Sequence, residues 1–170
     1  MLPDVKKILY ATDLSNPAKH ALGYALSLAQ RYDADLILLH AIPDWAHNVT
    51  LGSGLDFATI YDETSWLKIK DSVLRKSIKH AKERIEDAFK HYKIELEAEG
   101  ISTTIQVQTG HPVSTILSYA EEVDLIVMGT YGHSQLGNLF AGSVAQGVIA
   151  KSPTPVLVVH LEKDNTPTPL

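Results

Sequence analysis

Five short apolar runs rich in β-branched residues alternate along this chain with longer segments in which apolar residues recur every three or four positions. Short, nearly continuous apolar runs are typical of strands buried on both faces, and the longer period is typical of amphipathic helices. Strict alternation requires crossover connections, which predicts a parallel sheet covered by helices on both faces. The expected strands are 5–11, 34–42, 101–108, 124–128 and 156–159, and the expected helices are 18–32, 63–99, 113–120 and 143–150.

Two stretches stand outside this alternation. Residues 43–62 start at Pro43, contain Gly or Ser at each of 52–54 and have no clear period, so we expect a lid loop with a functional role. The polar end, 162–170, contains two Pro residues and is expected to be disordered. Residues 1–161 are then expected to form a single domain, which suits a chain of 170 residues.

Composition excludes several classes of protein. The chain has no Cys, so a disulfide framework, a thiolate metal site and a cysteine nucleophile are excluded, and the expected compartment is the cytoplasm. No segment approaches the roughly 18 apolar residues of a membrane span, so no membrane contact is predicted. The net charge is −5 and no Lys or Arg block is present, so no nucleic-acid partner is predicted.

The strand order decides where a ligand can bind. We predict a single doubly wound, five-stranded parallel sheet of the flavodoxin-like or Rossmann-like type, with strand order 3-2-1-4-5. Ligands of such sheets bind where the winding reverses, here at the carboxyl ends of the first and fourth strands, which lead into 12–15 and 129–143. Asp13 could cap the next helix, but Ser15 or Asn16 can cap it equally well, which leaves Asp13 for a ligand.

The second of these loops carries a glycine pattern. Gly129 and Gly132 are separated by two residues, and Gly142 followed by Ser143 comes after nine more, at the start of a helix. Glycines let a backbone approach an anion closely, amides at a helix N-terminus point toward it, and a Ser hydroxyl adds a donor. Glycines after a parallel strand are also needed simply to turn the chain, and the pattern alone leaves both interpretations open.

The loop resembles the G-2x-G-9x-G-(S/T) motif of the universal stress protein family, in its nucleotide-binding branch. The matching residues are Gly129, Gly132, Gly142 and Ser143. The resemblance extends over nearly the whole chain and is also carried by 7–15, 38–42 and 142–159. It implies an adenine nucleotide alpha hydrolase-like fold and an adenine nucleotide as cofactor, which is AMP, ADP or ATP, with Mg²⁺ brought only by the nucleotide.

The resemblance also implies a place for each candidate residue. Asp13 matches an aspartate that contacts the adenosine moiety, and His40 with Ala41 matches a backbone segment that reads the adenine edge. Ala11 stands where the family often has Pro near the ribose, and Thr12 lies between it and Asp13. The positions expected near the ribose and the phosphates are Met128, Gly129, Tyr131, Gly132, His133, Gly142, Ser143 and Val144.

Two of these positions depart from the family pattern. His133 follows the second glycine, where a basic residue is common, and Tyr131 stands where an imidazole or a similar group is common. An ordinary His has a pKa near 6.5 and is mostly neutral at pH 7, so it neutralises a terminal phosphate poorly. We therefore expect AMP or ADP to be held about as well as ATP.

The most consistent function is that of a nucleotide-responsive regulatory or protective protein of the stress response, without catalysis as its purpose. Two alternatives stay open: a slow ATPase or phosphotransferase with at most weak ATP hydrolysis, or a protein-interaction module with a structural nucleotide. The eight His residues show no metal-ligand spacing, so no metal site of the protein's own is predicted. The last strand, Val156–Val159, is an apolar edge strand in the predicted order, which favours a homodimer, as in the family.

Overall fold

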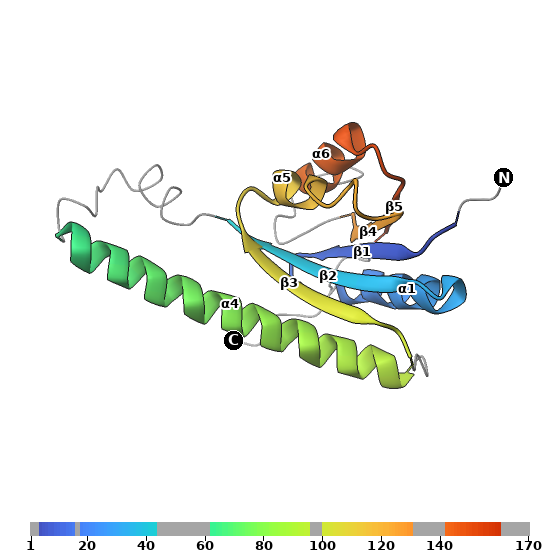
Figure 1. Cartoon of the computed structure of the whole chain (residues 1–170), viewed down its shortest axis with the longest axis horizontal. Helices are drawn as coiled ribbons and strands as arrows, with labels where there is room; N and C mark the ends of the chain where they lie inside the picture. The colour runs from blue at the N-terminus through green and yellow to red at the C-terminus, as the bar shows by residue number, and fades with distance from the viewer. Residues whose placement is uncertain (1–3, 16–17, 44–61, 96–99, 131–141, 161–170) are drawn as a thin grey trace, which may run out of the picture.

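The structure, a computed structural model, describes residues 4–15, 18–43, 62–95, 100–130 and 142–160 of the chain (Figure 1). Its centre is a five-stranded sheet in the order β3-β2-β1-β4-β5, in which every neighbouring pair is parallel. The predicted sheet and strand order are therefore confirmed. The strands are β1 (Lys7–Thr12), β2 (Asp35–Ile42), β3 (Thr103–Thr109), β4 (Leu125–Gly129) and β5 (Val156–Val159).

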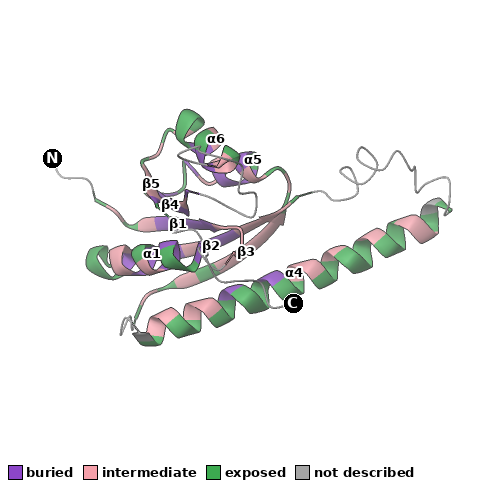
Figure 2. Cartoon of the chain, turned by 180° about the vertical axis from the view of Figure 1, so that it is seen from behind, coloured by how far each residue is buried: buried purple, intermediate pink, exposed green. Residues whose placement is uncertain are grey.

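Helices cover both faces of the sheet, as the alternation predicts. Figure 1 shows α4 (Glu63–Glu95) below the sheet and α5 (Pro112–Leu117) and α6 (Ser143–Lys151) above it. Helix α1 (Ala18–Tyr32) shares its core cluster with α4 and so covers the same face. Successive side chains of a strand point to opposite faces, so each strand supplies both layers of the core. On β1, Ile8 and Tyr10 pack toward α1 and α4, while Leu9 and Ala11 pack toward α5 and α6. Figure 2 shows the resulting burial along the central strands.

The helix expected over 113–120 ends three residues early, at Leu117. Beyond it, the amides of Tyr119 and Ala120 donate to carbonyl oxygens only three residues back, at 3.1 Å each. The Ser118 hydroxyl competes for the backbone by donating to the carbonyl of Thr115 at 2.8 Å. Ala120 is buried all the same. Tight turns and helices both place residues three positions apart on the same side of the chain. The spacing of the apolar residues therefore predicted a longer helix.

Helix α4 has 33 residues and, at 1.5 Å per residue, is about 50 Å long. Its start is capped by Asp62, whose Oδ1 accepts the Ser65 amide at 3.0 Å. Hydrogen bonds from the side chain and from the backbone of Ser65 lower the pKa of Asp62. Ala81 and Ile85 are buried against the sheet, whereas Leu67 in the first half is 57% exposed. The first half of α4 thus projects beyond the sheet (Figure 1).

Three predicted segments lie wholly or largely outside the described residues. These are the lid loop, of which only its first and last residues are described, the end of the long helix at 96–99, and the tail. In the part of the chain that the structure describes, no helix combines the length and the apolar character needed to cross a membrane.

Candidate functional site

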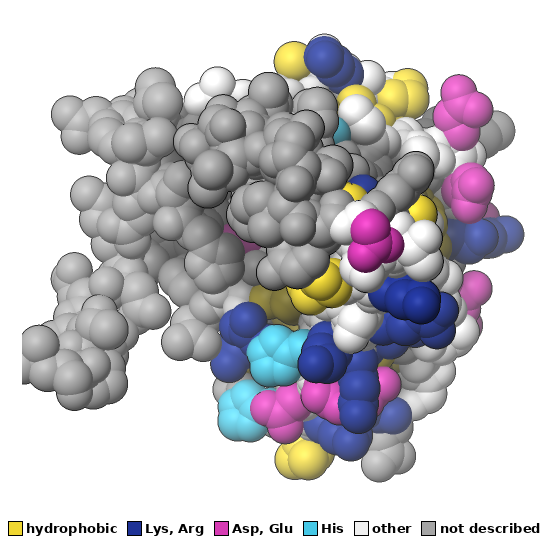
Figure 3. Space-filling model, turned by 90° about the vertical axis from the view of Figure 1, so that its left-hand side faces the viewer, with side chains coloured by type: hydrophobic (Ala, Val, Ile, Leu, Met, Phe, Trp, Pro, Cys, Tyr) yellow, Lys and Arg dark blue, Asp and Glu magenta, His cyan; other side chains and the backbone are white. Residues whose placement is uncertain are grey.

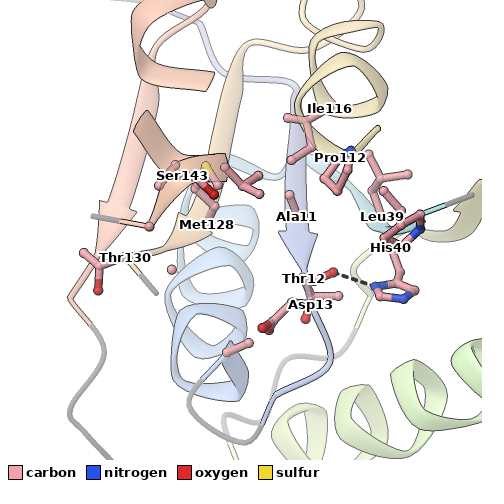
Figure 4. A pocket seen from close by; sticks show the side chains of 17 residues that line it. Ala11, Thr12, Asp13, Leu39, His40, Pro112, Ile116, Met128, Thr130 and Ser143 are labelled. Carbon is pink, nitrogen blue, oxygen red and sulfur yellow. Dashed lines mark hydrogen bonds between the residues drawn. The ribbon is translucent and has the colours of Figure 1, made fainter. Parts of the chain in front are cut away.

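A cavity of about 380 Å³ opens at the carboxyl edge of the sheet, where β1 and β4 lie side by side. This volume falls in the usual range of small-molecule sites, and the position is the one expected for a doubly wound sheet. Figure 4 shows its walls, which are the ends of β1, β2 and β4 and the first turns of α5 and α6. The lining residues are Ala11, Thr12, Asp13, Ala18, Leu39, His40, Ala41, Pro43, Pro112, Ile116, Met128, Gly129, Thr130, Gly142, Ser143, Val144 and Ala145.

The loop after β1 carries the acidic group of the cavity. Oδ1 of Asp13 accepts the amide of Ser15 at 3.0 Å, which orders the loop, and Asp13 Oδ2 is buried. The Ser15 hydroxyl in turn accepts the amide of Ala18, the first residue of α1, at 3.3 Å. Ser15 therefore caps α1, and the carboxylate of Asp13 lies at the cavity wall, as the sequence predicts.

His40 connects the ends of β1 and β2. Its Nδ1 lies 2.8 Å from the carbonyl oxygen of Thr12, as the dashed line in Figure 4 shows. A carbonyl oxygen can only accept, so Nδ1 carries the proton and the tautomer of the ring is determined. The hydrogen bond holds the two strand ends together and places the backbone of Ala41 at the cavity.

The first turn of α6 forms a wall that offers hydrogen-bond donors, in contrast to the carboxylate of Asp13. Gly142 is its N-cap, and the first intrahelical bond runs from the Gln146 amide to the Gly142 carbonyl at 3.0 Å. The amides of Ser143, Val144 and Ala145 precede that bond, so they have no partner within the helix. No acidic side chain lies in this turn. Amides in this position, with the positive end of the helix dipole, suit an anionic group.

A short backbone contact assembles the described parts of the glycine motif. The Gly142 amide donates to the Thr130 carbonyl at 2.5 Å, and the Thr130 amide donates to the Val159 carbonyl at 2.9 Å. Gly129, at the end of β4, therefore lies close to the start of α6. Tyr131, Gly132 and His133 lie outside the described residues.

Every site residue that the sequence predicts and the structure describes lies around this one cavity. These residues are Ala11, Thr12, Asp13, His40, Ala41, Met128, Gly129, Gly142, Ser143 and Val144. The sequence analysis missed an apolar part of the wall, formed by Leu39, Pro43, Pro112 and Ile116. The signal was present: Gly110, His111 and Pro112 follow the strand that neighbours β2, so their loop leaves the same edge of the sheet.

The charges near the cavity are few. Among its described lining residues none is Lys or Arg, and the described residues contain no cluster of three or more His, Asp or Glu suited to a metal ion. Cations gather instead on α4, over the lower part of the face in Figure 3. Nine of the fifteen Lys and Arg residues lie on α4, namely Lys68, Lys70, Arg75, Lys76, Lys79, Lys82, Arg84, Lys90 and Lys93.

Tyr10 links β1 to the start of α1 and so supports the loop between them. Its hydroxyl donates to the carbonyl of Ala18 at 2.6 Å, inside the core. Burial raises the pKa of Tyr10, so its hydroxyl keeps its proton and stays a donor at any physiological pH. This hydrogen bond holds the end of β1 against the start of α1 beside the cavity.

A doubly wound parallel sheet, a largely apolar cavity at the reversal of its winding, a carboxylate on one wall and a helix N-terminus on another define a small-molecule binding domain. The family model of the universal stress proteins matches residues 4–160, and the chain belongs to this family.

Relatives and solved structures agree with this assignment. The chain is 33% identical over 156 residues to universal stress protein MJ0577 of Methanocaldococcus jannaschii, which covers 91% of this chain and 94% of the relative. A universal stress protein of Thermus aquaticus is 32% identical over 164 residues, which covers 91% and 98%. The fold matches that of UspA from Lactobacillus plantarum with a TM-score of 0.72, 24% identity and coverage of 93% and 99%.

Proposed function

We propose that the cavity binds an adenine nucleotide, which is AMP, ADP or ATP, and that the chain acts as a nucleotide-responsive regulatory or protective protein of the cytoplasm. The observation that carries the proposal is the pairing of a carboxylate with a helix N-terminus across one apolar cavity. A carboxylate suits ribose hydroxyls, which are donors, and the amides in the first turn of α6, which have no partner within the helix, suit phosphate oxygens, which are acceptors.

Each wall then has a part in holding the nucleotide. Asp13 contacts the ribose of the adenosine, and the backbone of His40 and Ala41 reads the adenine edge, with Ala11 and Thr12 between them. The apolar wall accommodates the flat face of the base, as apolar walls of ligand sites do. The residues around the ribose and phosphates are Met128, Gly129, Tyr131, Gly132, His133, Gly142, Ser143 and Val144, with Mg²⁺ present only when the nucleotide brings it.

Two solved universal stress proteins suggest which compounds to try. One is described in complex with cAMP and one, from Archaeoglobus fulgidus, in complex with dAMP, with TM-scores of 0.56 and 0.58 to this chain. Each is 22% identical to this chain, so the likeness establishes the common fold and no more. Their ligands belong in the titration beside AMP, ADP and ATP.

The first test is chemical. The purified protein is denatured, and the released small molecules are identified by mass spectrometry. AMP, ADP and ATP are then titrated into stripped protein by calorimetry, with and without Mg²⁺. Release or binding of an adenine nucleotide supports the proposal, and near-equal affinities for the three support the His133 prediction. If nothing is released and none of the three binds, the glycine loop is only a turn.

The Ser143→Pro variant tests the phosphate end of the site. Pro at the first helical position removes an amide and a hydroxyl but is tolerated there, and the preceding Gly142 already has the extended conformation, with ψ 162°, that Pro requires. We expect AMP to bind about tenfold more weakly, a loss typical of a hydrogen bond to a charged group. Calorimetry with adenosine, which has no phosphate, is expected to show no change, and equal losses for both ligands would reject this placement of the phosphate.

A slow ATPase or phosphotransferase is the alternative from enzyme chemistry. The described part of the cavity supplies amides for phosphate but no Lys or Arg to neutralise charge that develops on a transferred phosphoryl group. Turnover of ATP with Mg²⁺, measured as released phosphate, discriminates between this alternative and simple binding.

An interaction module with a structural nucleotide is favoured by one feature, the exposed apolar residues on the projecting half of α4. These are Leu67, Ile69 and Val73. In that case partner binding is independent of added nucleotide. A pull-down carried out with stripped and with AMP-loaded protein distinguishes an interaction module from a nucleotide-responsive protein.

We also propose a homodimer through β5. Among the strands that the structure describes, β5 pairs only with β4, so its other edge offers backbone groups to a second copy. We expect the mass to exceed the 18.6 kDa of one chain at micromolar concentration. Val158→Asp is expected to weaken association at least about tenfold, because it places a charge at an apolar strand contact.

The matched control for the dimer is Thr104→Asp, on the exposed part of the opposite edge strand β3. It is expected to leave the mass unchanged. Because Val158 also packs against the core, circular dichroism of both variants checks that they stay folded. A wild-type monomer would contradict the proposed dimer.

A further inference from the structure

A long side chain of helix α4 reaches the loop after β1, beside the candidate nucleotide site. Nη2 of Arg84 donates to the carbonyl oxygen of Leu14 at 2.5 Å, across 70 positions of sequence. Arg84 stands next to Ile85 and three residues after Ala81, both of which are buried against the sheet. The guanidinium therefore extends from the part of α4 that is anchored in the core.

The carbonyl that Arg84 contacts belongs to an unusual turn. Leu14 has φ of 66°, in the left-handed region, which a residue with a branched side chain adopts only when its surroundings require it. The turn is held by two short bonds: the Leu14 amide donates to the Thr12 hydroxyl and the Ser15 amide donates to Asp13 Oδ1, both at 3.0 Å. The Leu14 side chain packs against the core below.

This turn determines where the Asp13 carboxylate lies. Asp13 precedes the left-handed residue directly, and its own Oδ1 is one of the acceptors that hold the turn. Relaxation of Leu14 to the common right-handed or extended region would reorient the peptide on the carboxyl side of Asp13. The carbonyl of Leu14 accepts a charge-assisted hydrogen bond from Arg84, which favours this orientation of the turn.

We propose that Arg84 is a positioning residue for nucleotide binding: it holds the Leu14 carbonyl, stabilises the left-handed turn and so keeps Asp13 directed at the ribose hydroxyls. Arg84 is absent from the described cavity lining, so it acts through the loop and not on the ligand. The inference rests on the proposed nucleotide function. It also makes α4 an element whose displacement changes nucleotide affinity.

The Arg84→Gln variant tests the inference by calorimetry with AMP. We expect binding about fivefold to tenfold weaker, at the low end for a charged hydrogen bond because the contact is exposed. Arg84→Lys keeps a cation that can donate to the same carbonyl, so it is expected to recover part of the affinity. The matched control is Arg75→Gln, which removes the same charge from α4 and, within the described part of the chain, breaks a surface pair with Asp71.

A second ligand separates positioning from general damage. The 2′,3′-dideoxy analogue of AMP offers no ribose hydroxyls to Asp13, so Arg84→Gln is expected to leave its affinity unchanged. In a double-mutant cycle, Arg84→Gln is likewise expected to cost nothing further once Asp13→Ala has removed the carboxylate that Arg84 positions. Equal losses for AMP and the analogue, additive losses in the cycle, or no loss at all would overturn the inference.

A measurement without ligand keeps the two proposals distinguishable. Hydrogen exchange at the Leu14 and Ser15 amides is expected to speed up in Arg84→Gln, while exchange within β1 stays as in the wild type. Unchanged exchange at both amides overturns the inference whatever the affinities are. A wild-type protein that binds no adenine nucleotide overturns the proposed function, and faster exchange in the variant would still support the role of Arg84 in the turn.

Discussion

Asp13→Ala is expected to weaken AMP binding about a hundredfold, the effect of losing two hydrogen bonds between ribose hydroxyls and a carboxylate. The substitution also removes the acceptor for the Ser15 amide, so the turn after β1 loses one of its supports. Asp13→Asn keeps an oxygen for that amide and removes only the charge. Its loss is expected to be smaller, about tenfold, and calorimetry on the two variants separates the two contributions.

The matched control for this pair is Asp35→Asn. Asp35 is exposed at the amino end of β2, at the edge of the sheet away from the cavity. It is expected to bind AMP as the wild type does. If Asp13→Ala binds AMP with wild-type affinity, the carboxylate has no part in holding the ribose and the site must be assigned differently.

Gly147→Ala is expected to lower the free energy of unfolding by about 1–3 kcal/mol, as measured by urea denaturation. Gly147 lies where α6 crosses α5, and a Cβ built on it would lie 2.8 Å from Cγ2 and 3.2 Å from Cγ1 of Val113. Val113 is β-branched and buried, so it has little freedom to move away. The added methyl group must push α6 from α5, which also shifts the helix N-terminus at the cavity.

Gly23→Ala is the control for this substitution, because it makes the same change in the middle of α1. A Cβ there would lie 3.5 Å from the ring of Tyr92, an ordinary contact. Its free energy of unfolding is expected to rise by about 0.5–1 kcal/mol, because Ala has a better helix propensity than Gly. Val113→Ala is expected to relieve Gly147→Ala, so the double variant should be more stable than the sum of the two single losses predicts. A stable Gly147→Ala protein would contradict the tight crossing.

The position of the cavity could be predicted from the sequence because strand order alone brings distant residues together. Asp13 and Ser143 are 130 positions apart, yet the order 3-2-1-4-5 pairs Ala11 with Met128 and so places their loops at one edge. The periodicity of apolar residues established the five strands, and the glycines marked the start of α6. None of these inferences needed a side-chain contact.

Contacts that depend on one side chain could not be predicted. Arg84 and Arg75 lie on the same helix among similar charges, and no sequence pattern indicates that only the first reaches Leu14. The left-handed conformation of Leu14 carries no sequence signal either, since Gly, Asn or Asp is the usual residue there. The apolar wall formed by Pro112 and Ile116 follows β3, which lies outside the pair of strands at the reversal of winding, so the rule for doubly wound sheets does not indicate it.

The projecting half of α4 also affects which method measures the mass of the proposed homodimer correctly. A rod about 50 Å long attached along one side of a small sheet increases friction without adding much mass. A single chain would therefore elute from a gel-filtration column ahead of a sphere of its own weight, in the direction of a compact pair. Light scattering or sedimentation equilibrium, which report mass independently of shape, are the measurements that count chains correctly for this protein.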